Sequence, residues 1–406
     1  MEHTILLDAS ITNVPGFTAA GVHCGLKKDG ALDLALVLSE RPAACAGVFT
    51  TNRFQAAPVL FDRAAIHADP RGMRAVAINS GCANACTGPE GIEDARQMAR
   101  LAGQAAGVDA NCVLVMSTGV IGQRLDMDKI GFGLAQAAKA LSDQGGHDAA
   151  RAIMTTDTRP KEYAVKAMVA GKEVTVAGMA KGAGMISPNM ATMLSLIVTD
   201  AQVTPAALEQ ILVYATDRSF NCVTVDGDMS TNDTLIIMAN GLADNPVIEG
   251  PESEGYDQLR DAVTATATEL AKMVAFDGEG ATKRVTIEVK GARTRDEGRT
   301  AAMSVANSPL VKTAIYGRDA NWGRILCAVG YSGVPVDPNR VDLWLGDVHL
   351  VHQGRPYDVN EERAAQILAQ EYVDITVDLG MGDESVTVWT CDLSHEYVSI
   401  NAHYRT

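Results

Sequence analysis

The 406-residue sequence has few aromatic residues, no long apolar run and no excess of basic residues. Aromatic side chains make up only 5% of it, so the core must be built mainly from aliphatic and small side chains. No apolar stretch approaches the roughly 20 residues that span a bilayer, and the first ten residues, MEHTILLDAS, lack the basic and apolar segments of a secretory signal. The formal net charge of −16 argues against binding to nucleic acid or to an anionic membrane, although a local basic pocket for a carboxylate remains compatible with it. We therefore expect a cytoplasmic protein.

Familiar motifs for metal and nucleotide binding are also missing. The eight histidines show no helical or loop spacing suited to a metal, such as HExxH. The eight cysteines are scattered, and the one close pair, Cys82 and Cys86, has no further ligands at a useful spacing, so we expect buried structural thiols. The glycine-rich segment 182–187 is not followed by the Lys-Ser/Thr pair of a phosphate loop. The sequence thus predicts no metal and no cofactor, while a Ser-His-Asp triad stays open because its order varies between folds.

The remaining composition is that of a globular protein with a sizeable core, with 47% hydrophobic and 21% charged residues. Strands and helices are expected in alternation throughout, and no repeat or Pro/Gly-rich linker divides the chain. This pattern favours an α/β fold with mixed, stacked sheets flanked by helices. The predicted strands are 32–39, 76–79, 113–116, 173–178, 193–198, 284–290, 341–345, 373–379 and 385–390, and the predicted helices are 92–107, 205–218, 256–274 and 361–370. The strand 113–116 is expected to run into a loop at residues 117–119.

One segment, 181–198 (KGAGMISPNMATMLSLIV), combines features that point to chemistry. Gly182 and Gly184 allow unusual backbone angles and close approach. Ala191 and Thr192 stand directly before an apolar run that is typical of a buried strand, so the Thr192 hydroxyl can face a cleft. Periodicity alone favours the simpler alternative, a glycine turn before a core strand with Thr192 buried and hydrogen-bonded.

A threonine at this place can act as a nucleophile if the chain is cut before it. A hydroxyl reacts poorly near neutral pH without a base, but an N-terminal threonine carries its own base, the α-amine, which titrates at about pH 8. The Thr192 hydroxyl would attack the Ala191 carbonyl, the acyl group would move from nitrogen to oxygen, and water would release the two pieces. The small side chain of Ala191 leaves that carbonyl accessible.

This segment, KGAGMISPNMATML, resembles the cleavage-site signature of the ornithine acetyltransferase family, the ArgJ-type glutamate N-acetyltransferases of arginine biosynthesis. The resemblance extends from about residue 13 to residue 406, which makes it far more specific than a single motif. Further stretches that carry it are AGVFTTNRFQAAPV (46–59), INSGCANACTG (78–88), STGVIG (117–122), MTTDTRPK (154–161), NCVTVDGDMSTNDT (221–234), DGEGATK (277–283), ANSPLVKTAIYGRDANWGRILCAVGYSG (306–333) and YVSINAHYRT (397–406).

The resemblance implies a fold that superficially resembles that of N-terminal-nucleophile enzymes, and a self-cleaving precursor. Cleavage between Ala191 and Thr192 would give an α fragment, 1–191, and a β fragment, 192–406, which stay together as an α2β2 assembly. The implied reaction is ping-pong: Thr192 takes the acetyl group from N-acetylornithine, ornithine leaves, and glutamate accepts the acetyl group. Whether acetyl-CoA also serves as donor is not decided by any residue.

The resemblance also assigns roles to residues that composition alone would treat as turn, surface or tail residues. Thr118 and Gly119 match an oxyanion-hole pair, a hydroxyl and a backbone N–H. Lys181 matches a group that holds the substrate α-carboxylate, and Glu279 matches an acidic group that could pair with the substrate amine or tune protonation near the Thr192 amine. Thr155, with a one-residue uncertainty toward Thr156, matches a substrate contact. The substrate-binding set implied in this way is Thr155, Lys181, Thr192, Glu279, Asn401 and Thr406.

Two rival hypotheses remain at this point. The first is an amidase or aminopeptidase that uses the same N-terminal nucleophile on the same fold, with water as the acceptor. The second is a non-enzymatic binding or structural protein that has kept the fold, which the filled nucleophile, oxyanion and carboxylate-binding positions disfavour. Asn232, Asp233 and the stretch 318–322 (RDANW) also match family signatures, but we expect them to support the fold or the site without taking part in catalysis.

Overall fold

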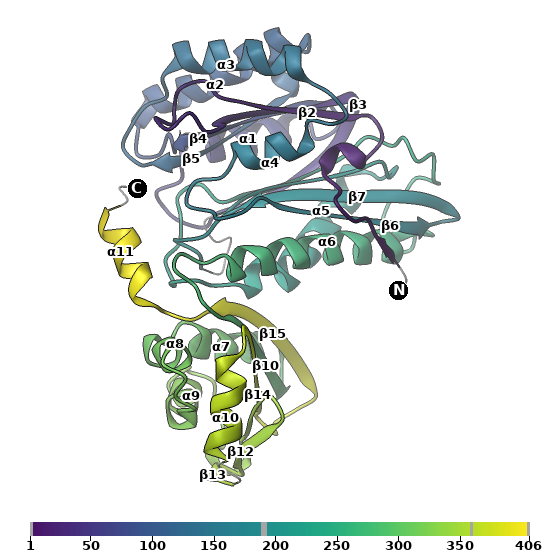
Figure 1. Cartoon of the computed structure of the whole chain (residues 1–406). Coiled ribbons are helices and arrows are strands. Elements are labelled where there is room, and N and C mark those ends of the chain that lie inside the picture. The colour runs from purple at the N-terminus through teal and green to yellow at the C-terminus, as the bar shows by residue number, and fades with distance from the viewer. Residues whose placement is uncertain (1–2, 188–192, 358–359, 404–406) are drawn as a thin grey trace.

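The computed structural model describes residues 3–187, 193–357 and 360–403. The chain forms two units, which lie one above the other in Figure 1. The first unit extends to the end of α6 (Tyr256–Phe276), and the second begins at β10 (Arg284–Ala292). A last helix, α11 (His395–His403), returns to the side of the first unit. Within the described ranges, no helix is both long enough and apolar enough to cross a membrane.

The first unit is a sandwich of two sheet layers that share the long strand β3 (Leu34–Phe49). The register of β3 shifts between Leu38 and Ala43, where Pro42 interrupts regular pairing. Its first half pairs with β2 and β4, and its second half pairs with β9, so the chain passes from one layer to the other. The strands described in this unit run in the order β1-β6-β7-β8-β9-β3-β4-β5, with β2 paired to β3. Their bounds are β1 His3–Ile5, β2 Phe17–Val22, β4 Met73–Cys82, β5 Val113–Val120, β6 Lys161–Val169, β7 Lys172–Lys181, β8 Leu194–Thr199 and β9 Thr234–Ala239.

A layer of apolar side chains fills the space between the two sheet layers. Ile78 and Met116 enter it from β4 and β5, and Met179, Leu196 and Ile236 enter it from β7, β8 and β9. Helices cover the outer faces, so the unit has helix, sheet, sheet and helix layers. The helices over β2 to β5 are α1 (Ala57–Ala68), α2 (Gly88–Ala106) and α3 (Met127–Ala140); those over the other layer are α5 (Pro205–Arg218) and α6; and α4 (Gly146–Ala152) packs at the edge of the sandwich.

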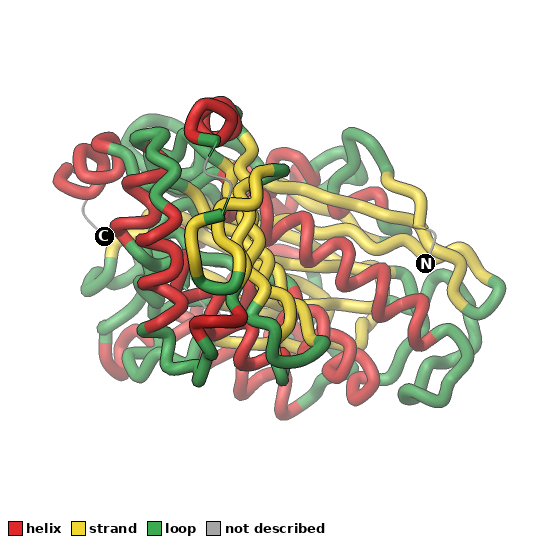
Figure 2. The backbone as a smooth tube through the Cα atoms, turned by 90° about the horizontal axis from the view of Figure 1, so that it is seen from below, coloured by secondary structure: helices red, strands yellow, loops and turns green. Residues whose placement is uncertain are grey.

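The second unit is a mixed sheet in the order β13-β12-β11-β14-β10-β15 among the described residues. Seen from below, its strands run between helices (Figure 2). Its buried side chains continue the core beneath α6, so the two units share one hydrophobic cluster. The remaining bounds are α7 Arg295–Ala306, α8 Pro309–Tyr316, α9 Trp322–Gly330, β11 Asp342–Leu345, β12 Val348–His352, β13 Arg355–Pro356, α10 Glu361–Ala369, β14 Tyr372–Asp378 and β15 Glu384–Cys391.

The predicted α/β class with stacked sheets is confirmed, as is every helix predicted from the sequence. Thr204 caps α5 by accepting the N–H of Ala207, as its place before Pro205 suggests. One local expectation is wrong: residues 117–119 do not form a loop after the strand, because β5 continues through them to Val120. Parallel pairing with β4 extends to these residues and overrides their turn-like composition.

The exposure of the cysteines also differs from the expectation of buried thiols. Cys86 and Cys327 are exposed, whereas Cys82 is buried and its thiol donates to the Gln123 carbonyl oxygen at 3.2 Å. The pair in NSGCANACTG therefore has its two sulfur atoms in different environments.

A buried ion cluster joins the start of β6 to the end of α6. Lys161 is fully buried, and its Nζ donates to Asp157 Oδ1 at 2.5 Å and to Asp277 Oδ2 at 2.7 Å. Asp277 also accepts the backbone N–H of Thr158 at 3.0 Å. Burial alone would raise the pKa of Asp157, but the charges of Lys161 and Lys181 and the N–H of Gly182 outweigh it and lower that pKa to about 2. The cluster is therefore stable only as a complete set of charges.

We predict that Lys161→Met lowers the free energy of unfolding by about 3–5 kcal/mol, because it leaves two carboxylates buried without their cation. Chemical denaturation monitored by circular dichroism measures this change. Lys166→Met on the same strand is the matched control, since the ion pair of Lys166 with Glu173 is partly exposed and is worth at most about 1 kcal/mol. Equal effects of the two substitutions would contradict the assignment.

The same cluster gives a pH signature. The folded-state pKa of Asp157 lies below its unfolded value, so its stabilising contribution is complete above about pH 5 and is lost as the pH falls toward 2. The contribution of Asp157 to the stability of the wild type is therefore expected to stay constant from pH 7 to about pH 5 and to fall below that. In Lys161→Met the buried carboxylates have lost their cation and take up protons at higher pH, so the stability difference between the two proteins shrinks from the pH at which they do so. Chemical denaturation at a series of pH values measures both.

Candidate active site

A polar pocket opens where the ends of β5 and β7 meet the loops beneath them and the helix α11. Residues from before and after position 191 in the sequence contribute to its wall. The predicted residues Thr118, Gly119, Thr155, Lys181 and Glu279 all line it, although they lie up to 161 positions apart in the chain. Its full lining is Ala83, Thr118, Gly119, Ile121, Thr155, Thr156, Lys181, Gly184, Met185, Asp226, Asp228, Ser230, Thr231, Asn232, Glu279, Tyr397 and Asn401.

The predicted nucleophile lies outside the described residues, as do Ala191 and Thr406. Met193, which follows Thr192 in the sequence, is described and is fixed on both sides of its peptide. Its N–H donates to Asp233 Oδ1 at 3.0 Å, and its carbonyl accepts the N–H of Thr234 at 3.1 Å. The next residue, Leu194, pairs with Lys181 across β7 and β8. The chain therefore enters β8 directly beside a residue of the pocket wall.

Thr118 and Gly119 occupy their place because β5 departs from regular pairing with β4. The register shifts beside Gly81, and Gly119 has a φ of +130°, a conformation that favours glycine. A Cβ at Gly119 would stand 2.3 Å from the carbonyl carbon of Gly81, so no larger residue fits there. The side chain of Thr118 accepts from Lys181 Nζ at 3.3 Å, which leaves the Thr118 O–H able to donate to another group.

Lys181 is the cation of the pocket. It ends β7 and is 3% exposed. Burial lowers the pKa of its ammonium group, and the nearby Asp157 carboxylate opposes that effect. Within the described part of the chain the ammonium donates to Thr118 Oγ1, and because an ammonium group has three donors, others stay available for an anionic ligand.

The Asp157 carboxylate holds two segments of the pocket wall together, the loop that contains Thr155 and the turn that begins at Gly182. Its Oδ2 accepts the N–H of Thr155 at 2.9 Å, and its Oδ1 accepts the N–H of Gly182 at 2.6 Å. Thr155 and Thr156 thus lie in a loop held against the end of β7, and not on a strand as β-branched residues alone would favour. Both threonines line the pocket, so the one-residue uncertainty between them stays.

Glu279 lies in the turn after α6 and faces the glycine-rich segment. Its N–H donates to the Ala183 carbonyl at 2.8 Å, and its Oε2 accepts from Asn401 Nδ2 at 2.8 Å. A Cβ at Gly184 would lie 2.4 Å from the Glu279 carboxylate, so the absence of a side chain at 184 makes room for the acid. Gly184 of the KGAG sequence is therefore required to leave space for the Glu279 carboxylate, and not only for backbone freedom.

The C-terminal helix α11 is docked on this wall. Besides the Asn401 contact, Tyr397 Oη donates to Asp226 Oδ2 at 3.2 Å. Burial, followed by the Asp226 charge, raises the pKa of Tyr397. Tyr397 and Asn401 of α11 line the pocket, and Figure 1 shows this helix at the side of the first unit. The C-terminal helix therefore completes a wall that residues from earlier in the sequence also form.

Sequence reasoning missed the contribution of Asp226 and Tyr397. Asp226 accepts the N–H groups of Met185 at 2.7 Å and Ile186 at 2.9 Å, and thereby shapes the segment that leads toward residue 192. Burial raises the pKa of this carboxyl. The signal was present in the quoted stretches VDGDMST and YVSIN, but nothing in either stretch indicates that it meets the other.

Asn232 and Asp233 support the site, as expected, and the stretch 318–322 does not line the pocket. Asn232 Nδ2 donates to the carbonyls of Ala83 at 2.7 Å and Ser117 at 2.8 Å, and so ties β5 to the loop after β4. Asp233 is fully buried, and burial raises its pKa well above the usual range. Together they hold the wall around Thr118 and the start of β8.

Comparison with known proteins identifies the family of this chain. A family model described as the ArgJ family matches residues 18–406. The arginine biosynthesis bifunctional protein ArgJ of Symbiobacterium thermophilum is 51% identical over 402 residues, 98% of this chain and 99% of the relative. The protein of the same name from Geobacter sulfurreducens is 51% identical over 396 residues, 97% of this chain and all of the relative.

Two solved structures are also similar in sequence. The arginine biosynthesis bifunctional protein ArgJ of Bacillus halodurans is 43% identical, with a TM-score of 0.49 over 50% of this chain and 96% of that chain. The ornithine acetyltransferase of Mycobacterium tuberculosis, solved in complex with ornithine, is 43% identical, with a TM-score of 0.44 over 48% of this chain and 100% of that chain. Because the family model and both curated relatives extend over nearly the whole sequence, this chain belongs to the ArgJ family.

Proposed function

We propose that this protein is a glutamate N-acetyltransferase of arginine biosynthesis that moves an acetyl group from N-acetylornithine to glutamate through Thr192. The observation that carries the proposal is the pocket itself. It combines a buried cation, Lys181, a hydroxyl, Thr118, which accepts from Lys181 and so can donate its own O–H, and the acid Glu279, beside the strand that begins just after Thr192. Membership in the ArgJ family supplies the pathway and the acetyl chemistry.

The charges of the pocket suit a zwitterionic amino acid. Lys181 would hold the α-carboxylate of the substrate as a point charge. Glu279, Asp226 and Asp228 line the same pocket and offer carboxylates to a substrate ammonium group. N-Acetylornithine carries one carboxylate and one ammonium group, and glutamate carries the same two groups with a second carboxylate.

In the proposed reaction the α-amine of Thr192 takes the proton of its own hydroxyl as the oxygen attacks the acetyl carbonyl. The Thr118 hydroxyl and the Gly119 N–H would stabilise the resulting oxyanion. The amide bond then breaks, the proton passes to the leaving ornithine nitrogen, and the acetyl group stays on Thr192 as an ester. Attack by the glutamate amine on that ester forms N-acetylglutamate and returns the free hydroxyl.

The division at Ala191–Thr192 is part of the same proposal. The sheet order supports fragments that stay together after cleavage, because β8 and β9 of residues 192–406 lie between β7 and β3 of residues 1–191. Separating the fragments would break both pairings and the core between the layers. No flexible linker is needed, since the strands themselves hold the halves.

The transferase reaction is tested by supplying N-acetylornithine with and without glutamate. We expect ornithine to accumulate beyond one equivalent per enzyme only when glutamate is present, with N-acetylglutamate formed in equal amount. Ornithine and acetate formed equally fast without glutamate would establish a hydrolase and overturn the proposal. A parallel reaction with acetyl-CoA and glutamate determines whether the enzyme has a second donor.

Cleavage is tested with Thr192→Ala. The variant is expected to remain a single chain of 406 residues without transferase activity, whereas the wild type should show two fragments that co-elute under native conditions. Thr192→Ser keeps a hydroxyl and is expected to cleave, though with altered speed. A fully active wild-type enzyme that remains one chain would rule out the N-terminal threonine mechanism.

Thr118→Val tests the oxyanion role. Valine keeps the branched shape of threonine but removes the O–H donor, so kcat is expected to fall by about 100- to 1000-fold with a smaller change in KM. Thr118→Ser restores the donor and should recover most of the rate. Steady-state kinetics on cleaved enzyme provide the comparison, and a Thr118→Val enzyme within threefold of the wild-type kcat would remove Thr118 from the mechanism.

A further inference from the structure

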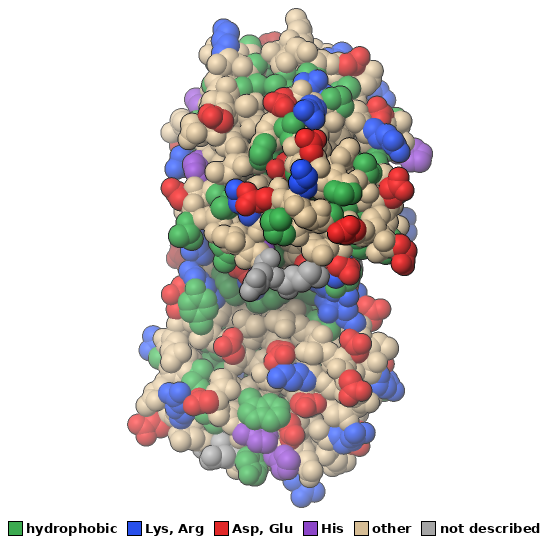
Figure 3. All heavy atoms as spheres, turned by 90° about the vertical axis from the view of Figure 1, so that its right-hand side faces the viewer, with side chains coloured by type: hydrophobic (Ala, Val, Ile, Leu, Met, Phe, Trp, Pro, Cys, Tyr) green, Lys and Arg blue, Asp and Glu red, His purple; other side chains and the backbone are tan. Residues whose placement is uncertain are grey.

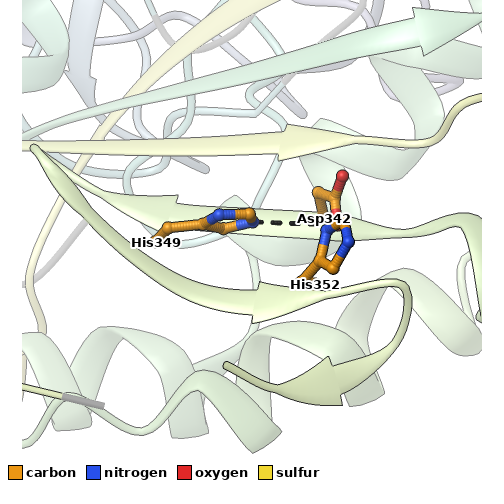
Figure 4. Close-up of side chains that lie close together, drawn as sticks. All are labelled: Asp342, His349 and His352. Carbon is orange, nitrogen blue, oxygen red and sulfur yellow. Dashed lines mark hydrogen bonds and ion pairs between the residues drawn. The ribbon is translucent and has the colours of Figure 1, made fainter. Parts of the chain in front are cut away.

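A second cluster of polar side chains lies on the second unit, at the edge of its sheet. Asp342 from β11 and His349 and His352 from β12 point toward one another (Figure 4). Histidine side chains also gather beside hydrophobic ones on this unit in the space-filling view (Figure 3). None of the three residues lines the pocket described above.

A bulge in β12 brings the two histidines together. Residues three apart on a regular strand face opposite sides of the sheet, so sequence spacing alone separates His349 from His352. The register shifts here: Leu343 of β11 pairs with Val351, but the next residue, Trp344, pairs with His349. The extra residue is Leu350, and Leu350 and Val351 are both buried. The bulge therefore turns both histidines to the same face.

The potential ligand atoms are close and are held by their surroundings. Asp342 Oδ1 lies 2.9 Å from His352 Nδ1 and 3.7 Å from His349 Nε2, and all the ligand atoms lie within 4.8 Å of one another. The N–H of Gln353 donates to Asp342 Oδ1 at 2.7 Å. The Trp344 ring stacks on His349 with centroids 4.4 Å apart and 15° between the planes.

One of these potential ligand atoms has no hydrogen-bond partner among the described residues. Nε2 of His349 is buried and makes no hydrogen bond within the described part of the chain, although it faces the Asp342 carboxylate. Buried polar atoms in folded proteins nearly always have a partner, and an unpaired one calls for an explanation such as an ion. The side chains of Asp342 and His352 are 23% and 45% exposed, so an ion can reach the site from solvent.

We propose that Asp342, His349 and His352 bind a divalent transition metal, with Zn²⁺ the ion that suits them best. Two imidazole nitrogens and one carboxylate oxygen form a common zinc ligand set, and tetrahedral zinc places its ligands about 3.3 Å apart. The separations of 2.9 and 3.7 Å from Asp342 Oδ1 to the two histidine nitrogens lie on either side of that value. Rotations of the side chains are therefore enough to bring the ligand atoms into tetrahedral positions around the ion. The fourth coordination position is open to water. This site is independent of the proposed acetyl transfer and would fasten β12 to β11 at the edge of the second sheet.

Zinc binding to the full-length protein, prepared without a polyhistidine tag, tests this site. The parent protein for these measurements carries Cys86→Ser and Cys327→Ser, because both thiols are exposed and a cysteine thiolate is itself a zinc ligand. Isothermal titration with ZnCl₂ is expected to show one Zn²⁺ per chain. His349→Gln and Asp342→Asn should each weaken binding by more than about 100-fold, since even loss of a supporting residue costs 10- to 100-fold.

His67→Gln, an exposed histidine on α1, is the matched control and should bind zinc as the parent does. Thermal unfolding gives a second readout: Zn²⁺ should raise Tm in the parent and in His67→Gln but not in His349→Gln or His352→Gln. Circular dichroism of the metal-free variants verifies their fold, and His352→Gln replaces His349→Gln if the latter fails to fold. Absence of zinc binding in the parent, or binding unchanged by all the site variants, would overturn the proposal.

Discussion

The buried carboxylate of Asp157 is the constraint on which the pocket depends. It receives the backbone N–H groups of Thr155 and Gly182 and the ammonium of Lys161, so one side chain fixes a loop, the end of β7 and the start of β6. A carboxylate in such a dry place is tolerated because its charge is fully matched, which is also why its pKa lies far below the usual range. Lys181, the last residue of β7, is positioned by this arrangement, because the N–H of the next residue, Gly182, donates to Asp157. The pocket is therefore placed by charge pairing in the core.

Strand order explains how the two fragments of the proposed cleavage after residue 191 would stay joined around one pocket. Because β8 and β9 lie between β7 and β3, each side of the division completes the sheet of the other. Parallel pairing of β8 with β9 sets where β8 begins, and antiparallel pairing with β7 sets Leu194 opposite Lys181. A break in the covalent chain just before β8 leaves these hydrogen bonds unchanged. The proposed nucleophile Thr192 and the pocket residues Thr118 and Lys181 could then belong to different fragments without losing alignment.

Local patterns in the sequence predicted the α/β class, the helices α2, α5, α6 and α10 and most of the described strands, since these depend on periodicity and capping. The resemblance predicted Thr118, Lys181 and Glu279, and the structure brings these three to one pocket. Contacts between segments that are far apart in the sequence could not be predicted. No local sequence pattern indicates that Tyr397 contacts Asp226, which lies 171 positions away. The extension of β5 through residues 117–119 was missed for the same reason, because its cause is pairing with β4 and not its own composition.

Both sites arise where a strand departs from regular pairing. Beside Gly81 the shift in register between β4 and β5, together with the φ of Gly119, exposes a hydroxyl and a backbone N–H at the pocket. At Leu350 the extra residue in β12 turns two histidines to the same face. A regular strand alternates its side chains between two faces, so neighbouring residues cannot meet one ligand; an irregular one breaks this alternation at a single point while the surrounding ladder keeps its rigidity. Such irregularities leave no clear mark in hydrophobic periodicity, which explains why the cluster of Asp342, His349 and His352 was invisible in a search for metal-binding spacings.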